Sequence, residues 1–181
     1  MRLMPALFIL VLVLGVGGRI QAQPLEFPKT EEEIVKALQP QAAPSPARTR
    51  GLSGRTRGIA KVAEAPPKVA ALVLFDYDSA AIRPESLPLV DEFGKALRGG
   101  LSNATILVIG HTDDVGDEAY NERLSLRRAE AVRHSLVTRH SIDPGRIQVG
   151  GMGEAQPVAD NGTEQGRAMN RRVEFERIGG Q

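Results

Sequence analysis

The sequence predicts an α+β domain in which helices cover one face of a small mixed sheet. Two apolar runs of strand length, 69–75 and 106–109, enclose a segment with helical periodicity. Near the C-terminus, residues 173–178 alternate apolar and charged side chains, which is the pattern of a strand with one face in water. We therefore expect a two-layer sandwich with the element order β-α-β-α-β-β.

The first helix of this domain is expected at residues 87–97, where apolar residues recur with helical spacing. Pro84 can begin the helix or the turn before it, and Gly99 can end it. Lys95 and Arg98 lie in the last turn, where the helix dipole favours positive side chains. These signals agree on a single helix between the first two strands.

A long helix is expected at about 118–139, and a short strand follows at 147–149. Between them, the tripeptide Asp-Pro-Gly at 143–145 is typical of a turn. Together with the C-terminal strand, these elements extend the predicted domain over residues 69–178.

The N-terminal residues 1–22 have the pattern of a secretion signal. Arg2 supplies the positive charge, residues 6–16 form an apolar run, and Ala22 is a suitable cleavage residue. A retained membrane anchor is the alternative, but the run is shorter than the ~20 residues that a spanning helix needs. We therefore expect export to the periplasm and a mature chain that begins near Gln23.

Residues 23–68 are rich in proline, alanine and arginine, and this composition predicts a largely extended linker. Thr30 followed by Glu33 matches a capping box, so a short helix is expected at 31–38. Alone it would be marginal, because helices below ~12 residues rarely hold in water.

The segment 48–61 contains five basic residues with no acidic residue between them, within a repeated Thr-Arg-Gly sequence. One hypothesis is that it contacts anionic outer-membrane lipid or another envelope protein. The other is that it is a solvated linker whose charges repel one another.

The composition excludes several classes of function. The chain has no cysteine, so it can form neither a disulfide, nor a thiolate metal site, nor a lipid anchor on cysteine. Aromatic residues make up only 4% of the chain, which disfavours nucleic-acid binding by base stacking. A net charge of +1 gives no overall field that would attract nucleic acid. Nucleic acid is therefore not an expected partner.

Arg128 breaks the pattern of the long helix. On a helical wheel Leu124, Val132 and Leu136 define the core-facing arc, and Arg128 falls inside that arc. A guanidinium turned toward a packed interface must be hydrogen-bonded and charge-paired, or its desolvation costs several kcal/mol. Arg128 is therefore expected to have an acidic partner.

A polar loop, 110–116, follows the second apolar run, at the end of a strand where sheet proteins often bind ligands. Its Asp113 is the natural candidate to face Arg128. An acid and a base held together can bind a zwitterion, the carboxylate taking an ammonium and the guanidinium taking a carboxylate. The alternative is an internal salt bridge that only ties the helix to the sheet.

Short motifs from residue 75 to residue 173 resemble, in order, the OmpA-like C-terminal domain, which also occurs in peptidoglycan-associated lipoproteins and flagellar stator proteins. These motifs are Phe75-Asp76-Tyr77-Asp78-Ser79, Gly110-His111-Thr112-Asp113, Tyr120-Asn121, Leu124-Ser125, Arg128-Ala129, Gly151-Met152-Gly153-Glu154, Pro157 and Asn170-Arg171-Arg172-Val173.

The resemblance implies non-covalent binding of peptidoglycan, through the diaminopimelate of its peptide stem, by a protein of the periplasm that can associate with the outer membrane. It implies no catalysis, cofactor or metal. In the family an aspartate and an arginine hold the ligand, and they match Asp113 and Arg128. The predicted ligand contacts are Asp113, Arg128, Thr112, Asn121, Arg171 and, more weakly, Asp78.

Two other functions stay open from the sequence. A cell-wall hydrolase could use His111 and a serine, but no Gly-x-Ser-x-Gly or His-Glu-x-x-His motif occurs. An adaptor could bind another envelope protein through residues 24–68 while the domain serves as its wall anchor.

Overall fold

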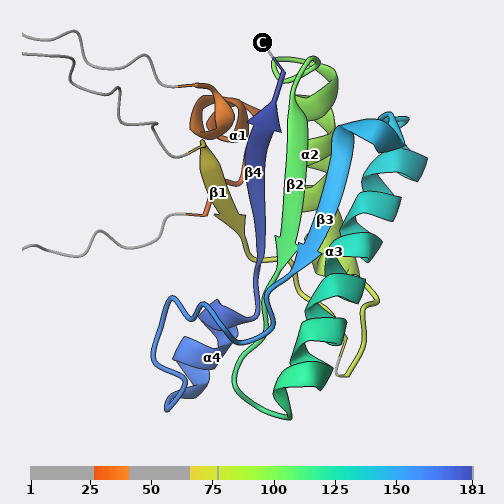
Figure 1. The fold of residues 1–181 in the computed structure, drawn as a ribbon. Coiled ribbons are helices and arrows are strands. Elements are labelled where there is room, and N and C mark those ends of the chain that lie inside the picture. The colour runs from red at the N-terminus through yellow and green to blue at the C-terminus, as the bar shows by residue number, and fades with distance from the viewer. Residues whose placement is uncertain (1–26, 41–65, 77, 181) are drawn as a thin grey trace, which may run out of the picture.

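The computed structural model describes residues 27–40, 66–76 and 78–180 (Figure 1). The predicted signal at 1–22 and the basic segment at 48–61 lie outside these residues. Two single turns of 3₁₀ helix lie at Pro84–Ser86 and Pro144–Arg146. The main elements are α1 (Glu31–Leu38), β1 (Lys68–Ala71), α2 (Leu87–Arg98), β2 (Thr105–Gly110), α3 (Glu118–His140), β3 (Ile147–Gly151), α4 (Glu164–Asn170) and β4 (Val173–Gly179).

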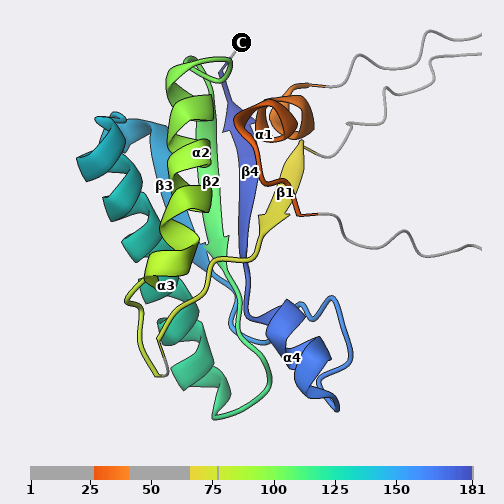
Figure 2. The same ribbon diagram turned by 180° about the vertical axis from the view of Figure 1, so that it is seen from behind.

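The four strands form one mixed sheet in the order β1-β4-β2-β3. β2 and β3 are parallel, and β4 is antiparallel to both β1 and β2. Helices α2 and α3 cover one face of the sheet, as Figure 2 shows from behind. The predicted α+β class with its helical layer on one face is therefore confirmed.

No helix in the described ranges is long and apolar enough to cross a membrane.

Two details of the expected elements are wrong. The first strand ends at Ala71, because the chain leaves the sheet there and only an isolated bridge, Phe75 to Ile82, follows. The helix α4 lies between β3 and β4 and was not expected from the sequence. It has only seven residues, too few to show a clear apolar period.

The hydrophobic core fills the space between the sheet and the helices. Val69, Phe175 and Val108 lie side by side in register on the three strands β1, β4 and β2, and all three are buried. The ring of Phe175 stacks on that of Phe93 from α2, with centroids 3.8 Å apart. Side chains of α2 thus pack directly on the centre of the sheet.

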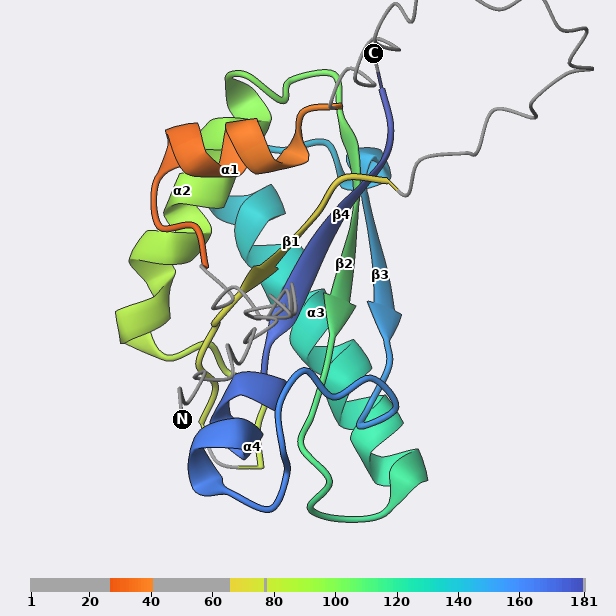
Figure 3. The same cartoon turned by 90° about the vertical axis from the view of Figure 1, so that its left-hand side faces the viewer.

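The helix expected at 31–38 is α1, and it packs on the domain instead of standing alone in a linker (Figure 3). Ile34 and Leu38 are fully buried in the same core as the sheet. The Glu31 amide donates to Glu92 Oε2 of α2 at 2.9 Å, which satisfies a free amide at the start of α1. This burial supplies the stability that so short a helix lacks on its own.

Thr30→Ala should loosen α1 without unfolding the domain. The Thr30 hydroxyl accepts from the Glu33 amide at 3.3 Å, and losing such a cap costs about 0.5 to 1 kcal/mol. Amide hydrogen exchange in α1 should become about two- to fivefold faster, while exchange in α3 stays unchanged. Thr30→Ser keeps the cap and is the control. Equal acceleration in α3 would contradict the expectation, because it would mean that the whole domain had been destabilised.

Gly110, the last residue of β2, lets α3 approach the end of the sheet. A Cβ at this position would overlap the backbone oxygen of Ser125 on α3. At Gly151, the last residue of β3, an added Cβ would lie 2.7 Å from the Leu126 amide nitrogen, which is also closer than side chains allow. Because only glycine allows this approach, the first half of α3 lies against the loop that leaves β2.

Candidate functional site

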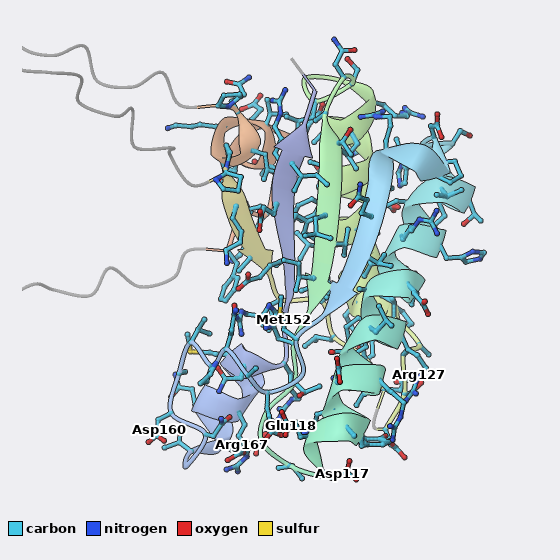
Figure 4. All side chains as sticks on the ribbon, viewed as in Figure 1. Asp117, Glu118, Arg127, Met152, Asp160 and Arg167 are labelled. Carbon is cyan, nitrogen blue, oxygen red and sulfur yellow. The ribbon has the colours of Figure 1, made fainter. Side chains whose placement is uncertain are left out.

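A cavity of about 500 Å³ lies where the loop after β2, the first half of α3, the loop after β1 and α4 meet. Figure 4 shows this end of the molecule, with Arg167 on α4 and Asp117 and Glu118 at the start of α3. All six residues predicted to contact a ligand line this cavity: Asp78, Thr112, Asp113, Asn121, Arg128 and Arg171. The fold thus gathers into one place residues that are 93 positions apart in the chain (171 − 78 = 93).

Arg128 points into the protein, as the helical wheel predicts, and only 7% of the residue is exposed. Its Nε donates to the Ser79 backbone oxygen at 3.2 Å, and its guanidinium lies 5.0 Å from the centre of the Phe75 ring. Within the described residues, Arg128 has no ion pair. Burial lowers its pKa, and the nearby charge of Asp113 only partly opposes that shift.

The expected pairing of Asp113 with Arg128 is not found. Asp113 Oδ2 instead accepts from Arg171 Nη1 at 2.7 Å, and its Oδ1 accepts from the Val115 amide at 3.3 Å. An internal salt bridge between Asp113 and Arg128 is therefore not what holds α3 to the sheet. The buried guanidinium and the carboxylate face one cavity without neutralising each other directly.

Arg171 connects the mostly buried carboxylate of Asp113 to the exposed carboxylate of Glu164 at the rim of the cavity. Its Nη2 donates to Glu164 Oε1 at 2.9 Å, while its Nη1 holds Asp113. Glu164 Oε2 in turn accepts from Arg167 Nη2 at 2.9 Å. These hydrogen bonds, first from Arg171 and then from Arg167, hold the pKa of Glu164 below its ordinary value. α4 is thereby connected to the loop after β2 by a chain of charges.

Thr112 and Asn121 differ in how they meet the cavity. The Thr112 hydroxyl is buried and has no hydrogen-bond partner among the described residues. Asn121 is also buried, but its Nδ2 donates to the Val115 oxygen at 3.2 Å and to Glu154 Oε2 at 2.6 Å. Asn121 therefore shapes the loop after β2 as well as lining the cavity.

Asp78 lies on the exposed loop after β1, with a φ of 50°. Few residues adopt this left-handed conformation, and aspartate is among the better tolerated. Asp78 and Arg128 line the same cavity, and the negative charge of Asp78 opposes the fall in the pKa of Arg128.

The profile of the OmpA family matches residues 74–171. The chain belongs to the OmpA family. The matched region contains all six cavity residues named above, whereas α1, β1 and β4 lie outside it.

Individual members of the OmpA family show the same relationship. The chain is 43% identical over 122 residues to outer membrane protein A of Bordetella avium, which is 64% of this chain and 62% of that protein. The match covers less than two thirds of each of the first curated relatives. Like these outer membrane proteins, the protein belongs to the bacterial cell envelope, at the periplasm and outer membrane.

Solved structures share the fold. A cell wall anchor of the T6SS from Pseudomonas aeruginosa is 35% identical, with a TM-score of 0.51, and the match covers 61% of this chain and 78% of that one. The peptidoglycan-associated lipoprotein from Burkholderia pseudomallei is 31% identical, with a TM-score of 0.52, and the match covers 57% and 86%.

The sequence reasoning missed a buried charged network whose central carboxylate, Glu174, lies outside the profile-matched region. The alternation in 173–178 predicts that Glu174 faces water, but Glu174 is 4% exposed. Its Oε1 accepts from Arg172 Nη2 at 2.6 Å, and its Oε2 lies 2.8 Å from Lys68 Nζ of β1. His111 Nε2 lies 3.5 Å from the same Oε2 atom of Glu174. His111 directly precedes Thr112, and Arg172 directly follows Arg171. Because Thr112 and Arg171 line the cavity, this network lies beside the site.

The residues considered for hydrolysis are not placed for it. His111 is buried beside Glu174 and does not line the cavity. The hydroxyl of Ser125 is also buried, donating to the Glu122 oxygen and accepting from the Gly153 amide. Both groups are thus engaged in the packing of α3 and the strand ends.

Proposed function

We propose that this domain binds peptidoglycan without covalent chemistry, through the diaminopimelate of its peptide stem, and so anchors an envelope protein to the cell wall. The observation that carries the proposal is the buried guanidinium of Arg128, which faces a cavity and has no ion pair within the described residues. A buried cation without a counter-ion is costly, and a ligand carboxylate would supply the missing charge.

Diaminopimelate has the chemistry that this cavity requires. The end of its side chain carries both an ammonium and a carboxylate. The planar fork of Arg128 suits a carboxylate, and the carboxylate of Asp113 suits an ammonium. Thr112 lines the cavity beside them, and its hydroxyl has no partner among the described residues.

The comparisons support this proposal independently of the geometry. Two of the similar solved structures are a cell wall anchor and a peptidoglycan-associated lipoprotein. Neither name describes an enzyme. The burial of His111 and Ser125 also makes a wall hydrolase the weaker alternative.

The full chain should sediment with purified sacculi and release no soluble muropeptides. Free diaminopimelate should displace it, whereas lysine, which lacks the second carboxylate, should require about tenfold more, because a charge-assisted hydrogen bond is lost. The measurement is the protein left in the supernatant as competitor is added. Release of muropeptides would favour the hydrolase, and equal competition by lysine would exclude diaminopimelate as the recognised group.

A further inference from the structure

Two carboxylates accept hydrogen bonds from Arg171 in the cavity, and they differ in exposure. The Asp113 side chain is 12% exposed, whereas the Glu164 side chain at the rim is 71% exposed. Exposed ion pairs contribute little free energy, because water and salt screen them. The contact with Glu164 is therefore the easier of the two to exchange for another anion.

Arg128 and Arg171 line the same cavity, and their positive charges repel each other. The charge of Arg171 adds to the burial that lowers the pKa of Arg128. A ligand carboxylate placed between the two guanidiniums would relieve both effects. On the Nη2 side of Arg171, that carboxylate would compete with the carboxylate of Glu164.

We propose that Glu164 is an internal competitor of the ligand, which occupies the outer side of Arg171 and limits the affinity of the site. The inference rests on the proposed function, because it requires a ligand with a carboxylate. Glu164 acts through Arg171 and not by contacting the ligand. Arg167, which also holds Glu164, keeps this competing carboxylate at the rim of the cavity.

The consequence is a gain of binding, which damage to the fold would not produce. Glu164→Gln removes the negative charge and leaves an amide of the same size on an exposed turn of α4. Affinity for purified sacculi should rise about two- to fivefold, the range expected for one exposed ion pair. Glu130→Gln is the matched control: it removes the same charge from an exposed position on α3 that does not line the cavity, and it should leave the affinity unchanged.

A double-mutant cycle with Arg171→Ala tests whether Glu164 acts through Arg171. In that background Glu164→Gln should give no gain. Weaker or unchanged binding by Glu164→Gln alone would overturn the inference. So would a gain that persists without Arg171, or an equal gain in Glu130→Gln, because either would reflect overall charge. If the parent protein does not bind sacculi at all, the proposed function has failed, and that result is distinct from each of these.

Discussion

Arg128→Ala should lower the affinity for sacculi at least about 30-fold and leave the fold intact. Truncating one member of a desolvated charged contact typically costs about 2 to 5 kcal/mol of binding free energy. The loss should fall on binding and not on folding, because Arg128 has no ion pair among the described residues that the substitution would break. Sacculus sedimentation over a range of protein concentrations measures the affinity, and circular dichroism with thermal unfolding measures the fold.

Arg127→Ala is the matched control for this variant. Arg127 is the neighbouring residue on α3, exposed on its outer side (Figure 4), and it does not line the cavity. It should bind as the parent does, although it loses the same charge. If Arg128→Ala and Asp113→Ala both sediment like the parent, the site is wrongly assigned. If Arg128→Ala unfolds, the guanidinium serves the fold and not a ligand.

The inward direction of Arg128 could be predicted because it depends on local geometry alone. A helix repeats every 3.6 residues, so Leu124, Val132 and Leu136 fix the buried side of α3 whatever the helix packs against. The strands β2 and β4 were predictable for the same reason, from runs and alternation in their own sequence. The six cavity residues came from motifs whose spacing resembles a known domain.

Contacts between distant segments could not be predicted from such patterns. The partner of Asp113 is Arg171, 58 positions along the chain, and their contact depends on how α4 is placed after β3. Glu174 alternates with Val173 and Phe175 as a water-facing residue would, yet Lys68 from β1 and Arg172 cover it. Alternation shows which face of a strand a side chain is on, but not what else lies on that face.

Glu174→Ala should lower the free energy of unfolding by about 3 to 5 kcal/mol, because it leaves the buried guanidinium of Arg172 without its carboxylate. Burial by itself raises the pKa of Glu174, but contacts with His111, Lys68 and Arg172 outweigh it and hold that pKa well below its ordinary value of 4.5. Urea unfolding at neutral pH measures the loss. Glu176→Ala, two residues along the same strand and only partly buried, is the control and should cost much less.

The same shift gives the expected pH dependence. A carboxyl group with a lowered pKa stabilises the folded state fully above its ordinary pKa of 4.5, and this contribution is lost as the pH falls below that value. The difference in unfolding free energy between the parent and Glu174→Ala should therefore be constant near neutral pH and shrink as the solution is acidified below pH 4.5. A difference that stays constant to low pH would mean that Glu174 stabilises the domain by packing alone. The contacts with Arg172 and Lys68 would then contribute little net stability.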